Sequence, residues 1–165
     1  MKISIFMALA LALTSTAFAG TIREGLYAEK NYAIMKHIST KEECREVKGK
    51  WDSEEGFCFD RADNTVEITK NNDGYKIVVS TISGGNLHTC EFEGEAKLSA
   101  DRMILTSTVE TTDYETDAKT TCTVKVTQKD GFLKKAVSVE EKGNCREFCG
   151  ANAYGLSIEK AVKIK

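Results

Sequence analysis

The chain lacks most of the residues from which catalytic and metal sites are built. Only two histidines are present, His37 and His88, and neither accompanies a Gly-x-Ser-x-Gly nucleophile motif. Zinc sites need Cys-x-x-Cys or histidine-rich spacing, and the cysteines here have neither. The one close pair of cysteines has Cys-x-x-x-Cys spacing, which is not that of a redox dithiol. We therefore expect no enzyme activity, no bound metal and no cofactor.

The chain also lacks a run of basic residues. Beyond the first residues it lacks a long apolar run as well. Residues 20–165 contain 22 basic and 25 acidic residues, a net charge of −3. This mildly acidic balance argues against nucleic acid and anionic membranes as partners. No segment after residue 19 approaches the length of a transmembrane helix, so no membrane insertion is expected. The sequence leaves the oligomeric state open.

The first 19 residues have the pattern of a secretory signal peptide. Lys2 supplies the positive charge, residues 3–13 are apolar, and Ala17-Phe18-Ala19 is an Ala-x-Ala cleavage step. The apolar run is too short to span a bilayer. We expect cleavage after Ala19, leaving residues 20–165 as one domain exported to the periplasm or secreted into the medium.

What the chain does contain is six cysteines, all in the expected mature part. They are Cys44, Cys58, Cys90, Cys122, Cys145 and Cys149. An even number of cysteines in an exported chain predicts three disulfides. Cys44 and Cys58 are close in sequence and predict a local bridge, which should contribute about 3 kcal/mol by closing a short loop.

The other two disulfides follow from the expected strand register. Lys129-Asp-Gly131 predicts a tight turn at residues 128–131. If the strands pair as simple hairpins, Cys90 lies level with Cys145, and Cys122 lies level with Val137 and the neighbourhood of Cys149. Cys90 and Cys122 are offset along the sheet, too far for a bridge of normal Cα separation. The register therefore predicts Cys90–Cys145 and Cys122–Cys149.

Apolar and polar residues alternate from residue 65 to the C terminus, with turn residues at short intervals and no proline. The clearest hairpin signal is Asn71-Asn-Asp-Gly74, because Asp-Gly favours the positive φ of a tight turn. Residues 65–165 therefore predict a mainly β, antiparallel meander or up-and-down barrel. The whole domain should have about eight strands and one short N-terminal helix.

Residues 20–38 are ambiguous between a strand pair and a short helix. In a strand pair, one face would carry Leu26, Tyr32, Ile34 and Ile38. In either form we expect this segment to close an edge of the sheet.

Residues 39–60 predict a separate helix–hairpin unit. Thr40 and Glu43 have capping-box spacing and predict a short helix that ends at Gly49. A hairpin around a polar turn should follow, with Trp51 before the turn and Cys58 after it. This arrangement resembles a small Cys-Trp-Cys module that recurs in exported bacterial proteins. We expect Trp51 to pack on the disulfide, with ligand stacking as the alternative.

Residues 110–119 are the best candidate for a binding surface. Around the aromatic Tyr114 they carry four acidic residues, Glu110, Asp113, Glu115 and Asp117. Negative charge steers the encounter with a basic protein and an aromatic side chain anchors it. The alternative is a merely solvated loop, which is the usual role of a charge run. His88, beside the predicted turn 83–86, is a second candidate contact.

The exported size, the β pattern over residues 65–165, the cysteines and the lack of a catalytic set resemble the periplasmic lysozyme-inhibitor proteins of Gram-negative bacteria. The resemblance implies a small barrel that inserts loops into the lysozyme cleft. The Ser-Gly-x-x-Tyr step of the membrane-bound c-type inhibitors has no counterpart, because Leu87 follows Ser83-Gly-Gly-Asn. No residue role is therefore transferred. A lipocalin-like carrier of a small apolar ligand and a structural envelope protein are the alternatives.

Overall fold

The computed structural model describes residues 21–83, 88–113, 115–129, 135–150, 153 and 155–165. The expected signal peptide, Tyr114 and parts of the predicted turns at 83–86 and 128–131 lie outside these ranges. Antiparallel strands dominate the described part, which confirms the prediction of a mainly β, antiparallel fold. Within the same ranges, no helix has the length and apolar character needed to cross a bilayer.

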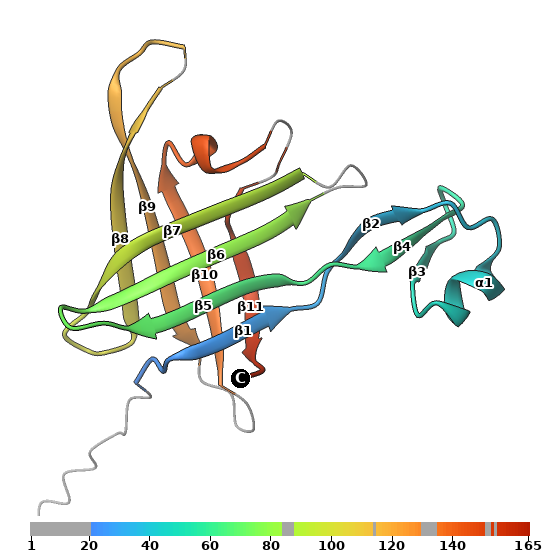
Figure 1. The fold of residues 1–165 in the computed structure, drawn as a ribbon, viewed down its shortest axis with the longest axis horizontal. Helices are drawn as coiled ribbons and strands as arrows, with labels where there is room; N and C mark the ends of the chain where they lie inside the picture. The colour runs from blue at the N-terminus through green and yellow to red at the C-terminus, as the bar shows by residue number, and fades with distance from the viewer. Residues whose placement is uncertain (1–20, 84–87, 114, 130–134, 151–152, 154) are drawn as a thin grey trace, which may run out of the picture.

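Eight antiparallel strands form the main sheet (Figure 1). They are β1 (Gly25–Glu29), β5 (Asn64–Lys70), β6 (Tyr75–Ser83), β7 (His88–Leu98), β8 (Ile104–Thr112), β9 (Lys119–Lys129), β10 (Ala136–Gly143) and β11 (Ile158–Lys163). The hydrogen-bonded order is β1-β11-β10-β9-β8-β7-β6-β5, and β5 pairs back with β1. Neighbouring strands from β5 to β11 are therefore also consecutive in the chain, whereas β1 pairs with the last strand, β11, and is separated from β5 by an insertion.

Strand β1 joins the two ends of the sheet. Its Tyr27 pairs with Val66 on one side and Lys163 on the other. The Tyr27 side chain is fully buried, and its hydroxyl donates to the Arg23 carbonyl at 2.7 Å. Because successive strand residues point to opposite faces, Tyr27 occupies the core and Leu26, the inward candidate in the sequence, is only half-buried.

The insertion between β1 and β5 forms a small unit beside the main sheet (Figure 1). It contains β2 (Tyr32–Lys36), α1 (Lys41–Glu46), β3 (Lys50–Asp52) and β4 (Phe57–Arg61), with strand order β2-β4-β3. The two strands within residues 20–38 therefore belong to different sheets and do not pair with each other. Thr40 caps α1, since its Oγ1 accepts from the Glu43 amide at 3.3 Å.

Apolar side chains fill the interior of the closed sheet. The largest fully buried ones are Tyr27, Phe92, Ile68, Ile77, Leu105, Leu156, Ile158, Val66, Val79, Val124, Val126 and Val137. All of them except Leu156 lie on strands, where the period-two alternation places them inward. Each such side chain contributes about 1.5–3 kcal/mol through burial. The described interior is thus a packed core.

All six cysteines are bonded, which confirms the prediction of three disulfides, and Cys44–Cys58 is the local bridge expected. The other two bridges are Cys90–Cys149 and Cys122–Cys145, so the predicted pairing of these four cysteines is wrong. None of the six cysteines is left as a free thiol.

The disulfide pairing was predicted wrongly because the register of β9 and β10 differs from the expected one. A tight turn at residues 128–131 would place Val137 opposite Cys122. Strand β10 instead begins at Ala136, which pairs with Lys129, and Gly143 lies opposite Cys122. Cys145 therefore follows directly beyond the end of β10 and reaches Cys122. Cys149, four residues later, reaches Cys90 on β7.

Candidate functional site

Residues 144–157, called the connector below, link β10 to β11, and their described part, 144–150, 153 and 155–157, lies at one end of the closed sheet (Figure 1). They include the short 3-10 helix η1 (Arg146–Phe148). The two disulfides fasten the connector to β7 and β9. The Gly150 amide donates to the Thr89 carbonyl at 2.9 Å, and Thr81 Oγ1 donates to the Gly155 carbonyl at 2.6 Å. The connector is therefore fixed to several strands of the sheet.

The β8–β9 hairpin projects beyond the sheet at the same end (Figure 1). Its tip, residues 113–118, is organised around one carboxylate. Asp113 Oδ1 accepts from the Glu115 amide at 3.0 Å and from the amide and hydroxyl of Thr116, both at 2.9 Å. The Asp117 amide donates to the Asp113 carbonyl at 2.8 Å. These bonds tie the described residues of the tip to Asp113.

The same hydrogen bonds hold the pKa of Asp113 below its usual range, the largest cause being the Thr116 hydroxyl and the next the amides of Thr116 and Glu115. A lowered folded-state pKa means that the carboxylate stabilises the tip above the pKa of the unfolded chain. This contribution is lost as pH falls through the lower, folded-state pKa. The tip should therefore stay ordered at neutral pH and loosen only in acid.

We predict that Asp113→Ala loosens the tip at neutral pH. Hydrogen exchange of the Glu115 and Thr116 amides should accelerate because both lose their acceptor. Exchange measured residue by residue checks this, with the Gly150 amide in the connector as the internal reference. Unchanged exchange at both tip amides would contradict the assigned role of Asp113.

Hydrogen bonds also join the hairpin to the connector. The Thr112 amide donates to Glu147 Oε2 at 3.1 Å, and Asn144 Nδ2 donates to the Thr112 carbonyl at 3.3 Å. The neighbouring Thr111 Oγ1 donates to the Asn144 carbonyl at 3.1 Å. Because disulfides hold the connector, these contacts also fix the direction in which the hairpin projects.

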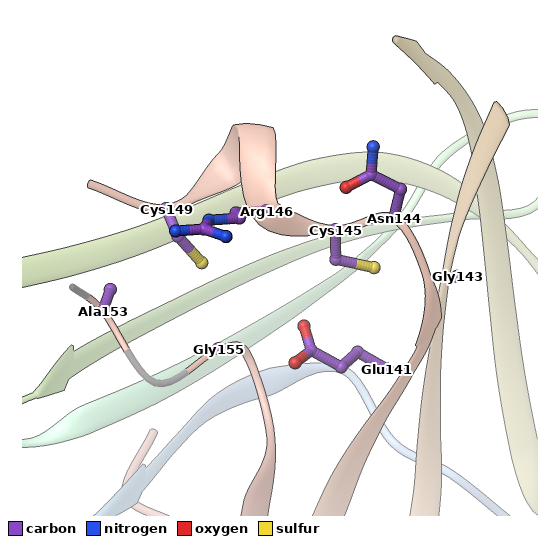
Figure 2. Close-up of a pocket in the computed structure, with 8 residues that line it drawn as sticks. All are labelled: Glu141, Gly143, Asn144, Cys145, Arg146, Cys149, Ala153 and Gly155. Carbon is purple, nitrogen blue, oxygen red and sulfur yellow. The ribbon is translucent and has the colours of Figure 1, made fainter. Parts of the chain in front are cut away.

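Two cavities lie along this end of the molecule. Figure 2 shows the first, of about 340 Å³, between the end of β10 and the connector. Its wall includes Glu141, whose Oε2 accepts from the Leu156 amide at 3.1 Å. Gly155 has φ +105°, and a Cβ there would collide with the Glu141 carboxylate. Glu141 therefore serves to hold the connector against β10.

The second cavity, of about 470 Å³, lies between the hairpin tip and the connector. It is lined by Asp113, Glu115, Asn144 and Arg146. Arg146 lines both cavities and is exposed, so its guanidinium sits among carboxylates and amides at the surface. Such a set of charged and hydrogen-bonding groups suits a polar surface of a partner better than an apolar small molecule.

The structure gathers most of the predicted binding residues. Asp113, Glu115 and Asp117 lie in the hairpin tip, and Glu110 is exposed on the adjoining strand β8. Tyr114 lies outside the described residues. His88 is not part of this group: it begins β7, which pairs with β8 only at Lys97 and Leu98, far along the strand. Figure 1 shows the start of β7 well away from the hairpin tip.

Sequence reasoning missed the contribution of the connector. Asn144, Arg146 and Glu147 were not candidates, although they lie beside the two cysteines that anchor this segment. Their position beside the cysteines could have identified them, since disulfides hold the neighbouring polar residues at the end of the sheet. Without the correct disulfide pairing, their place beside the hairpin tip could not be derived.

The fold and the site define a small, disulfide-linked β protein whose one end presents a structured, acidic hairpin. Comparison of the chain with known protein families, with curated proteins and with solved structures found no match.

Proposed function

We propose that this chain is an exported, non-catalytic protein whose closed sheet serves as an up-and-down barrel scaffold for binding a basic protein. The specific candidate partner is a cell-wall enzyme such as lysozyme, bound through the β8–β9 hairpin. The observation that carries the proposal is the conformation of the tip, in which Asp113 orders the residues that present Glu115 and Asp117 to solvent.

The charge of the hairpin supports a basic partner. Residues 110–119 contain four acidic residues and one basic residue, Lys119. Three ion pairs form within the described residues, at Lys36–Asp60, Arg61–Asp63 and Lys76–Glu93, and none neutralises the tip. Arg146 lies beside Asp113 and Glu115 and offsets part of this charge, but the four acidic residues still outnumber Lys119 and Arg146. The remaining negative field accelerates encounter with a cationic surface.

Order in the tip favours binding energetically. A loop that is already fixed loses less conformational entropy when a partner immobilises it, so more of the contact energy appears as affinity. The bonds from Thr112 to Glu147 and from Asn144 to Thr112 extend this order into the connector.

The filled interior favours a surface function over a carrier function. Phe92, Leu105 and Val124, which come from three successive strands, are fully buried in one cluster. A carrier of a small apolar ligand needs a hollow of several hundred Å³ inside the sheet. The three disulfides are consistent with an oxidising compartment outside the cytoplasm, where such a partner would be met.

An inhibition assay tests the proposal. Purified protein added to lysozyme should slow lysis of cell-wall substrate in a saturable way, with half-inhibition at or below roughly micromolar concentration. Lack of inhibition at micromolar excess would reject lysozyme as the partner. A captured partner that is not an enzyme would favour the envelope-structural alternative.

A charge-reversed variant tests whether the β8–β9 hairpin is the binding surface. Glu115→Lys with Asp117→Lys should weaken inhibition by at least about tenfold, because attraction becomes repulsion at the contact. The matched control is Glu54→Lys with Glu55→Lys, two exposed residues of the β3–β4 turn whose amides donate to Asp52 Oδ1 in a similar arrangement. An equal loss in both variants would show a general charge effect and contradict the assignment to the hairpin.

A further inference from the structure

A second, smaller site is formed on the inserted unit, away from the connector and the hairpin tip. A slot of about 270 Å³ lies between α1 and β3 and is lined by Lys41, Glu42, Arg45, Gly49 and Trp51. Lys41 and Arg45 are one helical turn apart and therefore share a face of α1. Trp51 is half-buried and forms part of the lining from β3.

The Cys44–Cys58 disulfide makes this slot rigid. Cys44 lies on α1 and is fully buried, and Cys58 pairs with Trp51 across β4 and β3. Gly49 packs directly on the bridge: a Cβ there would come within 2.5 Å of Cys58 Sγ and 3.0 Å of Cys44 Sγ. The Gly49 amide also donates to the Cys44 carbonyl at 2.9 Å. Helix and strand are thus held at a fixed separation.

The charged groups of the slot are available for a ligand. Lys41, Glu42 and Arg45 are exposed, and none takes part in the three ion pairs formed within the described ranges. Two cations outnumber one carboxylate, so the slot favours an anionic group. A guanidinium and an ammonium both donate strong, charge-assisted hydrogen bonds to a carboxylate.

The distribution of apolar surface narrows the ligand class further. Trp51 supplies the one large apolar face of the slot, and the remaining side chains are charged. A purely apolar ligand would leave most of its surface against charged groups or water. A sugar ring has one apolar face to lie on the indole and hydroxyl groups around its edge, which Glu42 can accept from and solvent can hydrate.

We propose that the α1–β3 slot binds an acidic saccharide, with a sugar ring on Trp51 and its carboxylate between Lys41 and Arg45. This site is independent of the hairpin and of the proposed partner there. It would give the protein a second means of attachment, to anionic polysaccharide outside the cytoplasm.

Trp51 is the only tryptophan in the chain, so its fluorescence reports directly on the slot. The full mature chain is titrated with a trimer of galacturonate as the probe, and in parallel with the same trimer methyl-esterified at its carboxyl groups. We expect a saturable change in fluorescence with the acid and none with the neutral ester. No saturable change up to about 10 mM, confirmed by calorimetry, or an equal response to the ester would overturn the proposal.

Variants that keep Trp51 in place test the role of the cations. Arg45→Gln should weaken binding of the acidic trimer about tenfold, and adding Lys41→Gln should weaken it further, because each removes a charge-assisted contact. The matched control is Lys50→Gln, an exposed neighbour of Trp51 that points to the opposite face of β3. Affinity unchanged in Arg45→Gln, or lowered equally in Lys50→Gln, would overturn the assignment of the slot.

Discussion

Replacing Cys90 and Cys149 together by alanine is expected to lower the free energy of unfolding by about 4 kcal/mol. The bridge spans 59 residues, and cross-linking so long a loop removes much of the conformational entropy of the unfolded chain. A loss of this size is a large part of the roughly 5–15 kcal/mol that stabilises a typical domain. Unfolding in guanidinium, followed by circular dichroism, measures it.

The Cys44→Ala, Cys58→Ala variant is the control for this effect. Its bridge spans only 14 residues, and the same entropy relation gives about 3 kcal/mol. The connector provides a second readout, since loss of Cys90–Cys149 releases it from β7 and should accelerate exchange of the Gly150 amide, which donates to the Thr89 carbonyl. A loss below about 1 kcal/mol with unchanged exchange would show that the connector does not depend on this bridge.

Phe92→Ala is expected to cost about 3–5 kcal/mol of stability, the usual range for removing a large aromatic side chain from a core. Phe92 is fully buried on β7. Its ring meets that of Phe148 in η1 edge to face, with centroids 5.1 Å apart. The substitution therefore leaves a cavity in the core and also removes the apolar contact beneath the connector.

Phe57→Ala is the matched control, since Phe57 is 41% exposed on β4 and lies outside the main core. We expect it to cost less than about 1 kcal/mol. Thermal or guanidinium unfolding of both variants gives the comparison. Similar losses at the two positions would mean that Phe92 is less well packed in solution than its burial indicates.

The alternation of residues predicted the strands well wherever a turn motif fixed the register. Asn71 and Gly74 set the β5–β6 hairpin, in which Lys70 pairs with Tyr75. The local Cys44–Cys58 bridge also followed from sequence, because a helix and an adjacent hairpin bring two nearby cysteines together. In each case the relevant interaction lies within a short stretch of chain.

The β9–β10 register, the pairing of four cysteines and the position of the connector depended on interactions between distant parts of the chain. Lys129-Asp-Gly131 looked like a tight turn, but β10 starts only at Ala136, and a shift in register changes every cross-strand neighbour. Strand β7 likewise pairs with β8 only at Lys97 and Leu98, although both strands are long. No local pattern encodes either feature, so the disulfide pairing and the connector half of the site were missed.

We propose above that the disulfide-anchored, acidic hairpin binds a basic protein through charge. The affinity for lysozyme, measured by calorimetry at low and at high salt for the wild type and the Glu115→Lys, Asp117→Lys variant, tests it most directly. We expect the wild type to bind tightly at low salt and much more weakly at high salt, because screening shortens the reach of exposed charges. The variant should bind poorly even at low salt. Binding that is insensitive to salt and equal in both proteins would contradict it.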